Sequence, residues 1–107
     1  MRYTVFWIDS AVEEVEEIRD YLRTQDQADY ATRLQQSLYA AAHKLQDHPN
    51  RGKPLPKLGP HYREVFQKPY RLIYEVQEPD QAVYVVAVLH TARDLPSAWA
   101  RRTRKPR

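Results

Sequence analysis

Arginine and histidine are the residues of this chain best suited to chemistry, and both lie at strand-like segments. Arg71 falls within Tyr62–Val76, a segment whose composition predicts two β-strands broken at Lys68-Pro69. A cation in so apolar a strand is unusual, because a buried guanidinium must be paired or must face a solvated groove. His90 ends the last apolar run and could act as a general acid or base near neutral pH. Arg71 and His90 are therefore the first candidates for a chemical role.

Further cations surround Arg71 in the sequence. Those between positions 51 and 71 are Arg51, Lys53, Lys57, Arg63, Lys68 and Arg71. Glu64 is the only acid in the same stretch. A concave surface carrying such cations would suit phosphate or carboxylate groups, which arginine binds with two parallel hydrogen bonds. A purely structural interpretation stays open, in which Arg71 pairs with Glu75 or Glu64 and His90 is the capped end of a strand.

Composition excludes several other kinds of site. The chain has no cysteine, so it holds neither a disulfide nor a thiolate metal site. It also lacks a nucleophile elbow, a phosphate-binding loop, a dinucleotide fingerprint and metal-ligand spacing, so we expect no cofactor and no metal. No apolar run approaches the roughly 20 residues of a membrane span, and no signal peptide is recognisable. We expect a cytoplasmic protein without a membrane partner.

Positive charge is concentrated at the C-terminus. The formal net charge is +3. Five cations fall in the last seven residues: Arg101, Arg102, Arg104, Lys105 and Arg107. Without them, 12 cations face 14 acids, because 17 minus 5 is 12, so the body of the protein is slightly acidic. We interpret residues 98–107 as a flexible basic tail and residues 1–97 as a single domain.

The N-terminal half predicts one strand and two helices. Tyr3–Ile8 is apolar on both faces, which indicates a strand inside a sheet. Apolar residues recur at helical spacing in Ala11–Arg23 and again in Gln27–Gln46. Asp9 and Ser10 are the two N-cap candidates of the first helix, and Ser10 has an acid three residues later, the spacing of a capping box. The acidic cluster on that helix is interpreted as a solvated face: Glu13, Glu14, Glu16 and Glu17.

The C-terminal half predicts a β-meander. Pro49–Pro60 is a loop rich in proline and glycine, expected to have no secondary structure. The two strands of Tyr62–Val76 follow, and Ala82–Leu89 is a third, strongly apolar strand. The order β-α-α-β-β-β predicts an α+β fold of two layers, with a helical hairpin on one sheet face. In a regular ladder the other face would hold Arg71 together with Arg63, His90 or both.

Taken together, these segments resemble the RelE/ParE superfamily of toxins from type II toxin–antitoxin systems. The resemblance covers nearly the whole chain and depends on the pieces V-F-W-I-D-S-A-V-E-E-V-E-E-I, H-P-N-R-G-K-P-L-P-K-L, Y-R-E-V, Y-R-L-I-Y-E-V and V-V-A-V-L-H-T-A-R-D-L-P. It implies the same α+β fold. It also implies a cognate antitoxin, encoded in the adjacent gene, that is partly disordered and folds on binding.

The superfamily divides by target, and the sequence bears on that division. Relatives that cleave mRNA on the ribosome resemble this chain at Arg71 and His90. Some of them carry a glutamate in a K-P-E-P-like loop and a tyrosine after the histidine, where this chain has Leu55 and Thr91. The ending Arg93-Asp94-Leu95-Pro96 resembles ParE-like members instead. The resemblance thus implies that the toxin acts on DNA gyrase. The alternative that it implies is a ribosome-dependent mRNA endonuclease, in which Arg71 and His90 would be the catalytic residues.

If the chain is ParE-like, the residues in contact with the target or with phosphate would be cations other than the candidate nuclease residue Arg71. These candidates are Arg51, Lys53, Lys57, Arg63 and Arg93. A slightly acidic body is also a poor partner for ribosomal RNA, whose affinity depends on neutralised phosphates. We therefore expect a toxin of the ParE-like type that is not itself an enzyme.

Overall fold

A five-stranded mixed sheet organises the molecule, of which the computed structural model describes residues 2–103. The elements in chain order are β1 (Thr4–Trp7), α1 (Asp9–Thr24), α2 (Ala28–His43), the 3-10 helix η1 (Lys44–Gln46), β2 (Lys53–Pro54), β3 (Tyr62–Gln67), β4 (Tyr70–Gln77), β5 (Ala82–His90) and α3 (Leu95–Thr103). The strand order is β1-β5-β4-β3-β2, with β1 parallel to β5 and the other pairs antiparallel. The predicted α+β fold is confirmed.

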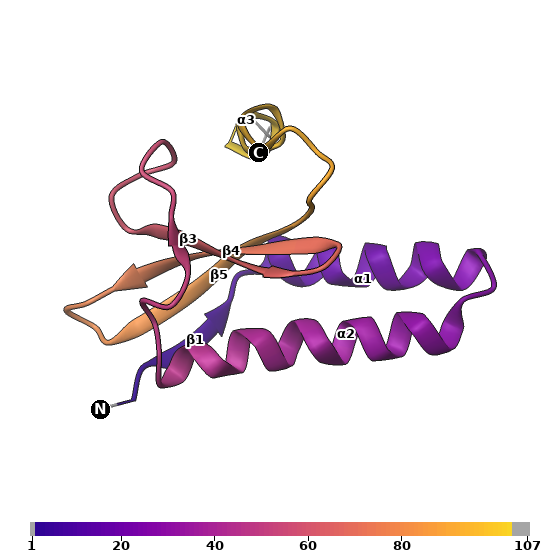
Figure 1. Ribbon diagram of the computed structural model, residues 1–107, viewed down its shortest axis with the longest axis horizontal. Coiled ribbons are helices and arrows are strands. Elements are labelled where there is room, and N and C mark those ends of the chain that lie inside the picture. The colour runs from indigo at the N-terminus through magenta and orange to yellow at the C-terminus, as the bar shows by residue number, and fades with distance from the viewer. Residues whose placement is uncertain (1, 104–107) are drawn as a thin grey trace.

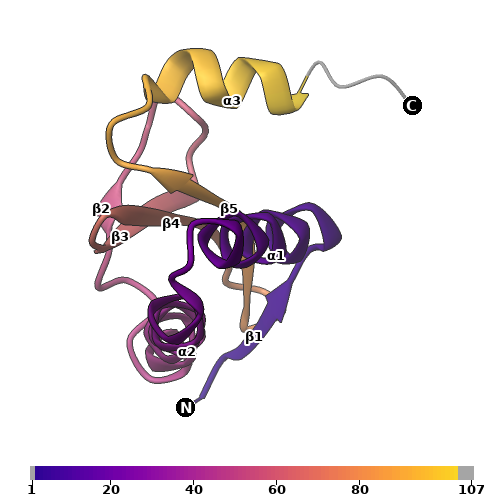
Figure 2. The same ribbon diagram turned by 90° about the vertical axis from the view of Figure 1, so that its right-hand side faces the viewer.

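Helices cover the two faces of the sheet unequally. The hairpin of α1 and α2 lies against one face, and the short α3 lies beyond the other (Figures 1 and 2). The connection between α1 and α2 turns at Asp26, which has a φ of 60°. Aspartate tolerates this left-handed conformation better than most residues, so the second helix folds straight back along the first. The predicted hairpin is confirmed, and α3 is an addition to it.

The apolar core lies mainly under the helical hairpin. Its fully buried members come from both helices and from the central strands, among them Val15, Leu38, Leu72 and Val85. Such residues supply most of the driving force for folding, at about 25 cal/mol per Å² of apolar surface removed from water. A second cluster lies on the opposite face, where Ala98 of α3 packs over Ile73 and Leu89. The sheet thus has a hydrophobic cluster on each side.

Four expectations about the elements differ from the structure. β1 lies at an edge of the sheet, not inside it, and its apolar Phe6 is 46% exposed while stacking on Tyr84. α1 begins at Asp9 directly after β1, with Ile8 in the N-cap position and no side-chain cap from Ser10. The loop after α2 contains the two-residue strand β2, because Lys53 and Pro54 pair with Glu64 and Arg63.

The fourth difference concerns the C-terminal region. α3 runs through the boundary expected between residues 97 and 98 and continues to Thr103. Ala98 is only 2% exposed and Trp99 is partly buried, so the helix is anchored to the sheet rather than forming a free tail from residue 98. The rest of the expected tail, residues 104–107, lies outside the described part of the chain.

A β-bulge in β5 decides which way the end of that strand faces. The register changes from Tyr74 opposite Val85 to Ile73 opposite Ala87, so Val86 is the extra residue. One extra residue inverts the alternation of side chains beyond it. Val85 and Val88 both face the helical hairpin as a result, although an odd number of positions separates them. His90 is turned to the same side.

Candidate functional site

Arg71 and His90 lie on opposite faces of the sheet. Arg71 pairs with Leu89 across β4 and β5, and Tyr70 pairs with His90. Directly opposed residues share a face, and Leu89 belongs to the cluster beneath α3, while Tyr70 packs on the core of the helical hairpin. The expectation that His90 would join Arg71 required a regular ladder, and the bulge at Val86 removes that condition. A sheet therefore separates the two candidate catalytic side chains.

The guanidinium of Arg71 is engaged by a buried carboxylate. Its Nη1 donates to Oε1 of Glu64 at 3.0 Å, and the Glu64 side chain is only 4% exposed. The Arg71 side chain is 16% exposed, and its guanidinium carbon lies 5.6 Å from the centre of the Phe66 ring. The ion pair and the aromatic face hold the cation in place. Of the two structural partners considered from sequence, Glu64 is the one that the structure selects.

His90 lies at the mouth of a pocket on the helical side. Its Nδ1 accepts a hydrogen bond from the backbone N–H of Ala92 at 3.0 Å, and its ring meets Tyr70 edge-on with centroids 5.3 Å apart. This bond occupies Nδ1 within the chain and leaves Nε2 as the ring nitrogen available to other groups.

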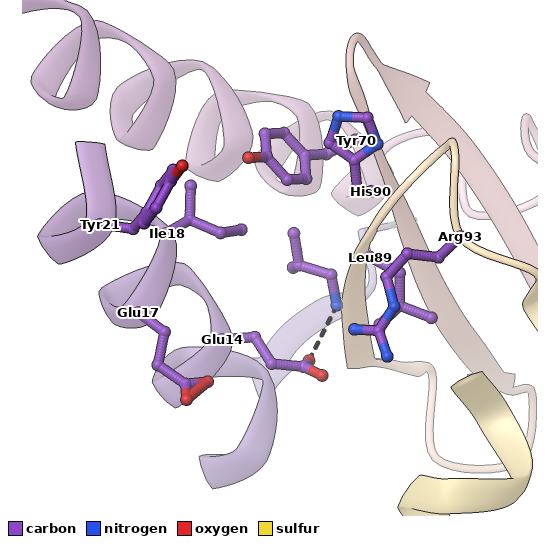
Figure 3. Close-up of a pocket in the computed structure, with 9 residues that line it drawn as sticks. Glu14, Glu17, Ile18, Tyr21, Tyr70, Leu89, His90 and Arg93 are labelled. Atoms are coloured by element: carbon purple, nitrogen blue, oxygen red, sulfur yellow. Dashed lines mark hydrogen bonds between the residues drawn. The ribbon is translucent and has the colours of Figure 1, made fainter. Parts of the chain in front are cut away.

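The pocket beside His90 has a volume of about 320 Å³ and mixed polarity (Figure 3). It is lined by Glu14, Glu17, Ile18, Tyr21, Tyr70, Val88, Leu89, His90 and Arg93. Burial raises the pKa of the Tyr70 hydroxyl, and the neighbouring Tyr30 and Tyr21 raise it further. Tyr70 therefore stays protonated at neutral pH and can donate a hydrogen bond.

Glu14 has a structural role in the same pocket. β1 ends at Trp7, and the next residue, Ile8, donates its N–H to the carbonyl of Val85. Further along β5, the Glu14 carboxylate accepts the N–H of Val88 at 3.0 Å, as the dashed line in Figure 3 marks. A side chain of α1 thus satisfies a strand edge that β1 no longer covers. This corrects the interpretation of the acidic helix face as wholly solvated.

The remaining cations are distributed over separate surfaces. Arg63 is used internally, since its Nη1 donates to the carbonyls of Asn50 at 3.0 Å and Gly52 at 2.7 Å. Lys53 and Lys57 line a groove between their loop and α3. Arg93 lies at the His90 pocket, on the far side of the sheet from Arg71. Of these candidates, Arg93 is therefore separated from Arg71 by the sheet, and Arg63 is engaged by backbone carbonyls.

Tyr74 fixes the start of the basic, proline-rich loop, Pro49–Pro60. Its buried hydroxyl donates to the carbonyl of Pro49 at 2.8 Å and accepts the N–H of Gly52 at 2.9 Å. Burial raises the pKa of this phenol, and the bond from Gly52 partly offsets the rise. A Cβ on Gly52 would come within 2.6 Å of the Glu64 carbonyl and of the Tyr74 hydroxyl, so glycine is required here by close approach. The loop therefore holds Arg51 in a defined, exposed position.

The two positions that differ from the nuclease relatives are occupied by groups without acid–base function. Leu55 packs against the apolar cluster beneath α3, and its N–H donates to the carbonyl of Tyr62 at 2.9 Å. Thr91 donates its backbone N–H to the carbonyl of Pro69 at 2.8 Å.

Within residues 2–103 no group of three potential metal ligands comes together, and no helix is long and apolar enough to cross a membrane.

Solved structures with this arrangement are toxins and toxin–antitoxin complexes. The chromosomal ParDE system from P. aeruginosa matches with a TM-score of 0.70 and 16% identity, covering 83% of this chain and 96% of the other. The complex RelBE2 from Mycobacterium tuberculosis matches with a TM-score of 0.66 and 22% identity, covering 84% and 99%. A mutant of E. coli toxin RelE in the free state matches with a TM-score of 0.64 and 17% identity, covering 98% and 100%. At these identities the likeness establishes the fold, that of RelE/ParE toxins.

The sequence itself identifies the family. Residues 5–95 match the profile of the ParE toxin of type II toxin–antitoxin systems, from parDE. A comparison with curated proteins gave no match. The chain belongs to the family of ParE toxins of type II toxin–antitoxin systems. The family match ends where α3 begins, so α3 is described by the structure and not by the family profile.

Proposed function

We propose that this toxin inhibits DNA gyrase, and thereby replication, rather than cleaving mRNA. The separation of Arg71 and His90 by the sheet carries the proposal. Cleavage by attack of a ribose 2′-OH needs a base, an acid and phosphate stabilisation at one place. Arg71 is paired with Glu64 on one face, and Nδ1 of His90 is engaged by the N–H of Ala92 on the other. The match to ParE toxins over residues 5–95 also supports gyrase inhibition over mRNA cleavage.

Side-by-side assays of the two candidate targets test the proposal. The purified toxin is added to gyrase with relaxed plasmid DNA, and separately to a translating ribosome extract with a defined mRNA. We expect loss of supercoiling and accumulation of cleaved DNA, with intact mRNA. Codon-specific cleavage of ribosome-bound mRNA with unaffected gyrase would overturn the proposal in favour of the endonuclease.

A cognate antitoxin is the second part of the proposal. The solved relatives include complexes of such toxins with their antitoxins, which supports an antitoxin for this chain. The apolar surface available to it includes the free edge of β1 with the exposed ring of Phe6, and Tyr21 and Tyr30 on the helical hairpin. Free strand edges accept an added strand, and paired helices accept an amphipathic helix.

Two measurements test this part: growth of cells that express the chain, and hydrogen exchange with and without the adjacent gene product. The chain alone should stop growth when expressed, and co-expression of the partner should restore it. In the complex we expect new protection along Ala11–Gln46 or at a sheet edge. Protection confined to Arg101–Arg107 would contradict this mode of binding.

A further inference from the structure

An apolar groove lies between the proline-rich loop and α3, on the face of the sheet opposite the helical hairpin. Its volume is about 560 Å³, within the range of clefts that take specific ligands. Leu55 and Leu58 of the loop form one wall, and Leu95 and Trp99 of α3 form the other. Neither the match over residues 5–95 nor the proposed target assigns a role to this groove.

The α3 wall is held by defined contacts. The Asp94 carboxylate caps the helix by accepting the N–H of Ser97 at 3.2 Å, and these bonds to Ser97 lower the pKa of Asp94. Ala98 is buried against the sheet. The ring of Trp99 meets Tyr62 of β3 edge-on, with centroids 5.4 Å apart. The helix is thus fixed at its first turn and in its middle.

The loop wall is equally fixed. Leu55 donates its N–H to the carbonyl of Tyr62 at 2.9 Å, and Leu58 donates to the carbonyl of Leu55 at 3.0 Å. Pro54 and Pro56 restrict the backbone between them. Two ordered walls mean that the groove is preformed, and a ligand therefore loses little free energy to ordering the protein.

Among the described side chains that line the groove, the charged ones are Lys53 and Lys57, both exposed. The sequence has no acid from Pro49 to Arg63, and none from Leu95 to the end of the chain. The nearby Asp94 is engaged as the cap of α3. An occupant complementary to this surface is apolar at its centre and negatively charged beside it. The long stems of the lysines add to the apolar wall while their ammonium groups stay in water.

From this geometry we propose that the groove binds an acidic peptide segment of a partner protein through large apolar anchor residues. Two separate lysines on the rim fit carboxylates on either side of an apolar anchor, whereas a fatty acid offers one carboxylate. The inference goes beyond the proposed function and does not depend on gyrase being the target.

Binding of short blocked peptides to the 107-residue chain tests the inference. The probe carries two leucines flanked by glutamates, one control replaces the glutamates by lysines, and another replaces the leucines by serines. The two tryptophans give a built-in comparison, because Trp99 lines the groove and Trp7 packs on Tyr39 beneath the hairpin. We expect the glutamate–leucine probe alone to bind and to shift the NMR indole signal of Trp99, leaving that of Trp7 in place.

A matched pair of charge reversals sharpens the test. Lys57→Glu should weaken binding of the probe about tenfold, because it places like charges together at the rim. Lys68→Glu makes the same change in net charge at the exposed β3–β4 turn and should leave binding unchanged. Equal binding of the lysine-flanked peptide, or signal changes that map away from Leu55, Leu58 and Trp99, would overturn the inference. Binding of a fatty acid such as laurate, without binding of the peptide, would overturn the inference as well.

Discussion

The two faces of the central sheet use the same strands for different purposes. Side chains toward the helical hairpin are almost all apolar and meet two long helices, as Leu72 and Val85 do. Side chains toward α3 include the Glu64–Arg71 pair, beside a small apolar cluster that one short helix covers. The first face secures the fold, and the second holds a largely buried ion pair and an open groove. Substitutions on the two faces should therefore differ in what they damage.

The largest loss of stability is expected on the hairpin face. Leu72→Ala removes a fully buried side chain and should lower the free energy of unfolding by about 2–5 kcal/mol. Leu95→Ala shortens the same type of side chain at the half-buried start of α3 and should cost less. Urea denaturation of the two variants measures the difference. Equal losses would show that the second face is as important to the fold as the first.

The next effect concerns the ion pair on the α3 face. Arg71→Ala leaves the Glu64 carboxylate buried without its partner and should cost about 3 kcal/mol, at the low end for such pairs because Arg71 is partly exposed. The double variant Arg71→Ala with Glu64→Gln should recover much of that loss, since no buried charge then remains. A double-mutant cycle in urea gives both values. Simple additivity would contradict the pairing.

A smaller effect is expected at Tyr74, whose side chain links the hairpin face to the basic loop. Tyr74→Phe removes both hydrogen bonds of the hydroxyl and should cost about 1–3 kcal/mol. Exchange of the Gly52 amide should accelerate in the variant. An unchanged exchange rate there would mean that the loop is held by other contacts, such as those of Arg63.

The same phenol contributes to pH dependence. The pKa of Tyr74 is raised in the folded state, so its contribution to stability is complete below the unfolded pKa near 10 and is lost as the pH rises through the folded value. The wild type should therefore lose stability more steeply than Tyr74→Phe above about pH 10. Parallel urea titrations at alkaline pH measure the two slopes.

The smallest effect is local to α3. The pKa of Asp94 is lowered by its hydrogen bonds to Ser97, so the capping contribution is present above the unfolded pKa near 4 and is lost as the pH falls through the folded value. Asp94→Ala should increase amide exchange at the start of α3 at neutral pH and leave the hairpin face unchanged. Exchange mapped by NMR distinguishes the two faces directly.

Much of the fold could be predicted from periodicity. Helical spacing of apolar residues located both helices of the hairpin, and the proline at Lys68-Pro69 located the break between β3 and β4. The predicted position of β1 inside the sheet was wrong. Two apolar faces indicate a strand in the interior of a sheet, whereas β1 lies at the edge and its exposed Phe6 stacks on Tyr84. α3 was missed because its apolar residues are few, although Asp94 followed by Ser97 is a recognisable capping signal.

The candidate site was harder to predict. The pairing of Arg71 with Glu64 was one of the alternatives from the sequence, since both residues lie on adjacent strands. The face on which His90 lies could not be predicted. The extra residue Val86 inverts the alternation of side chains in β5, and the sequence gives no sign of it because β5 is apolar both before and after Val86. Glu14 was taken for part of a solvated face, because a contact between positions 14 and 88 leaves no trace in local spacing.

Growth arrest by the His90→Ala toxin tests the central claim most directly. The substitution leaves Arg71 and the α3 face untouched, and it lies across the sheet from both. A gyrase inhibitor that uses no general acid or base should arrest growth as the wild type does at equal soluble expression. Removing a required acid or base from a nuclease typically lowers the rate by about 10²–10⁴-fold. Loss of toxicity in His90→Ala with the fold intact, together with loss of an mRNA cleavage that the wild type performs, would contradict the account.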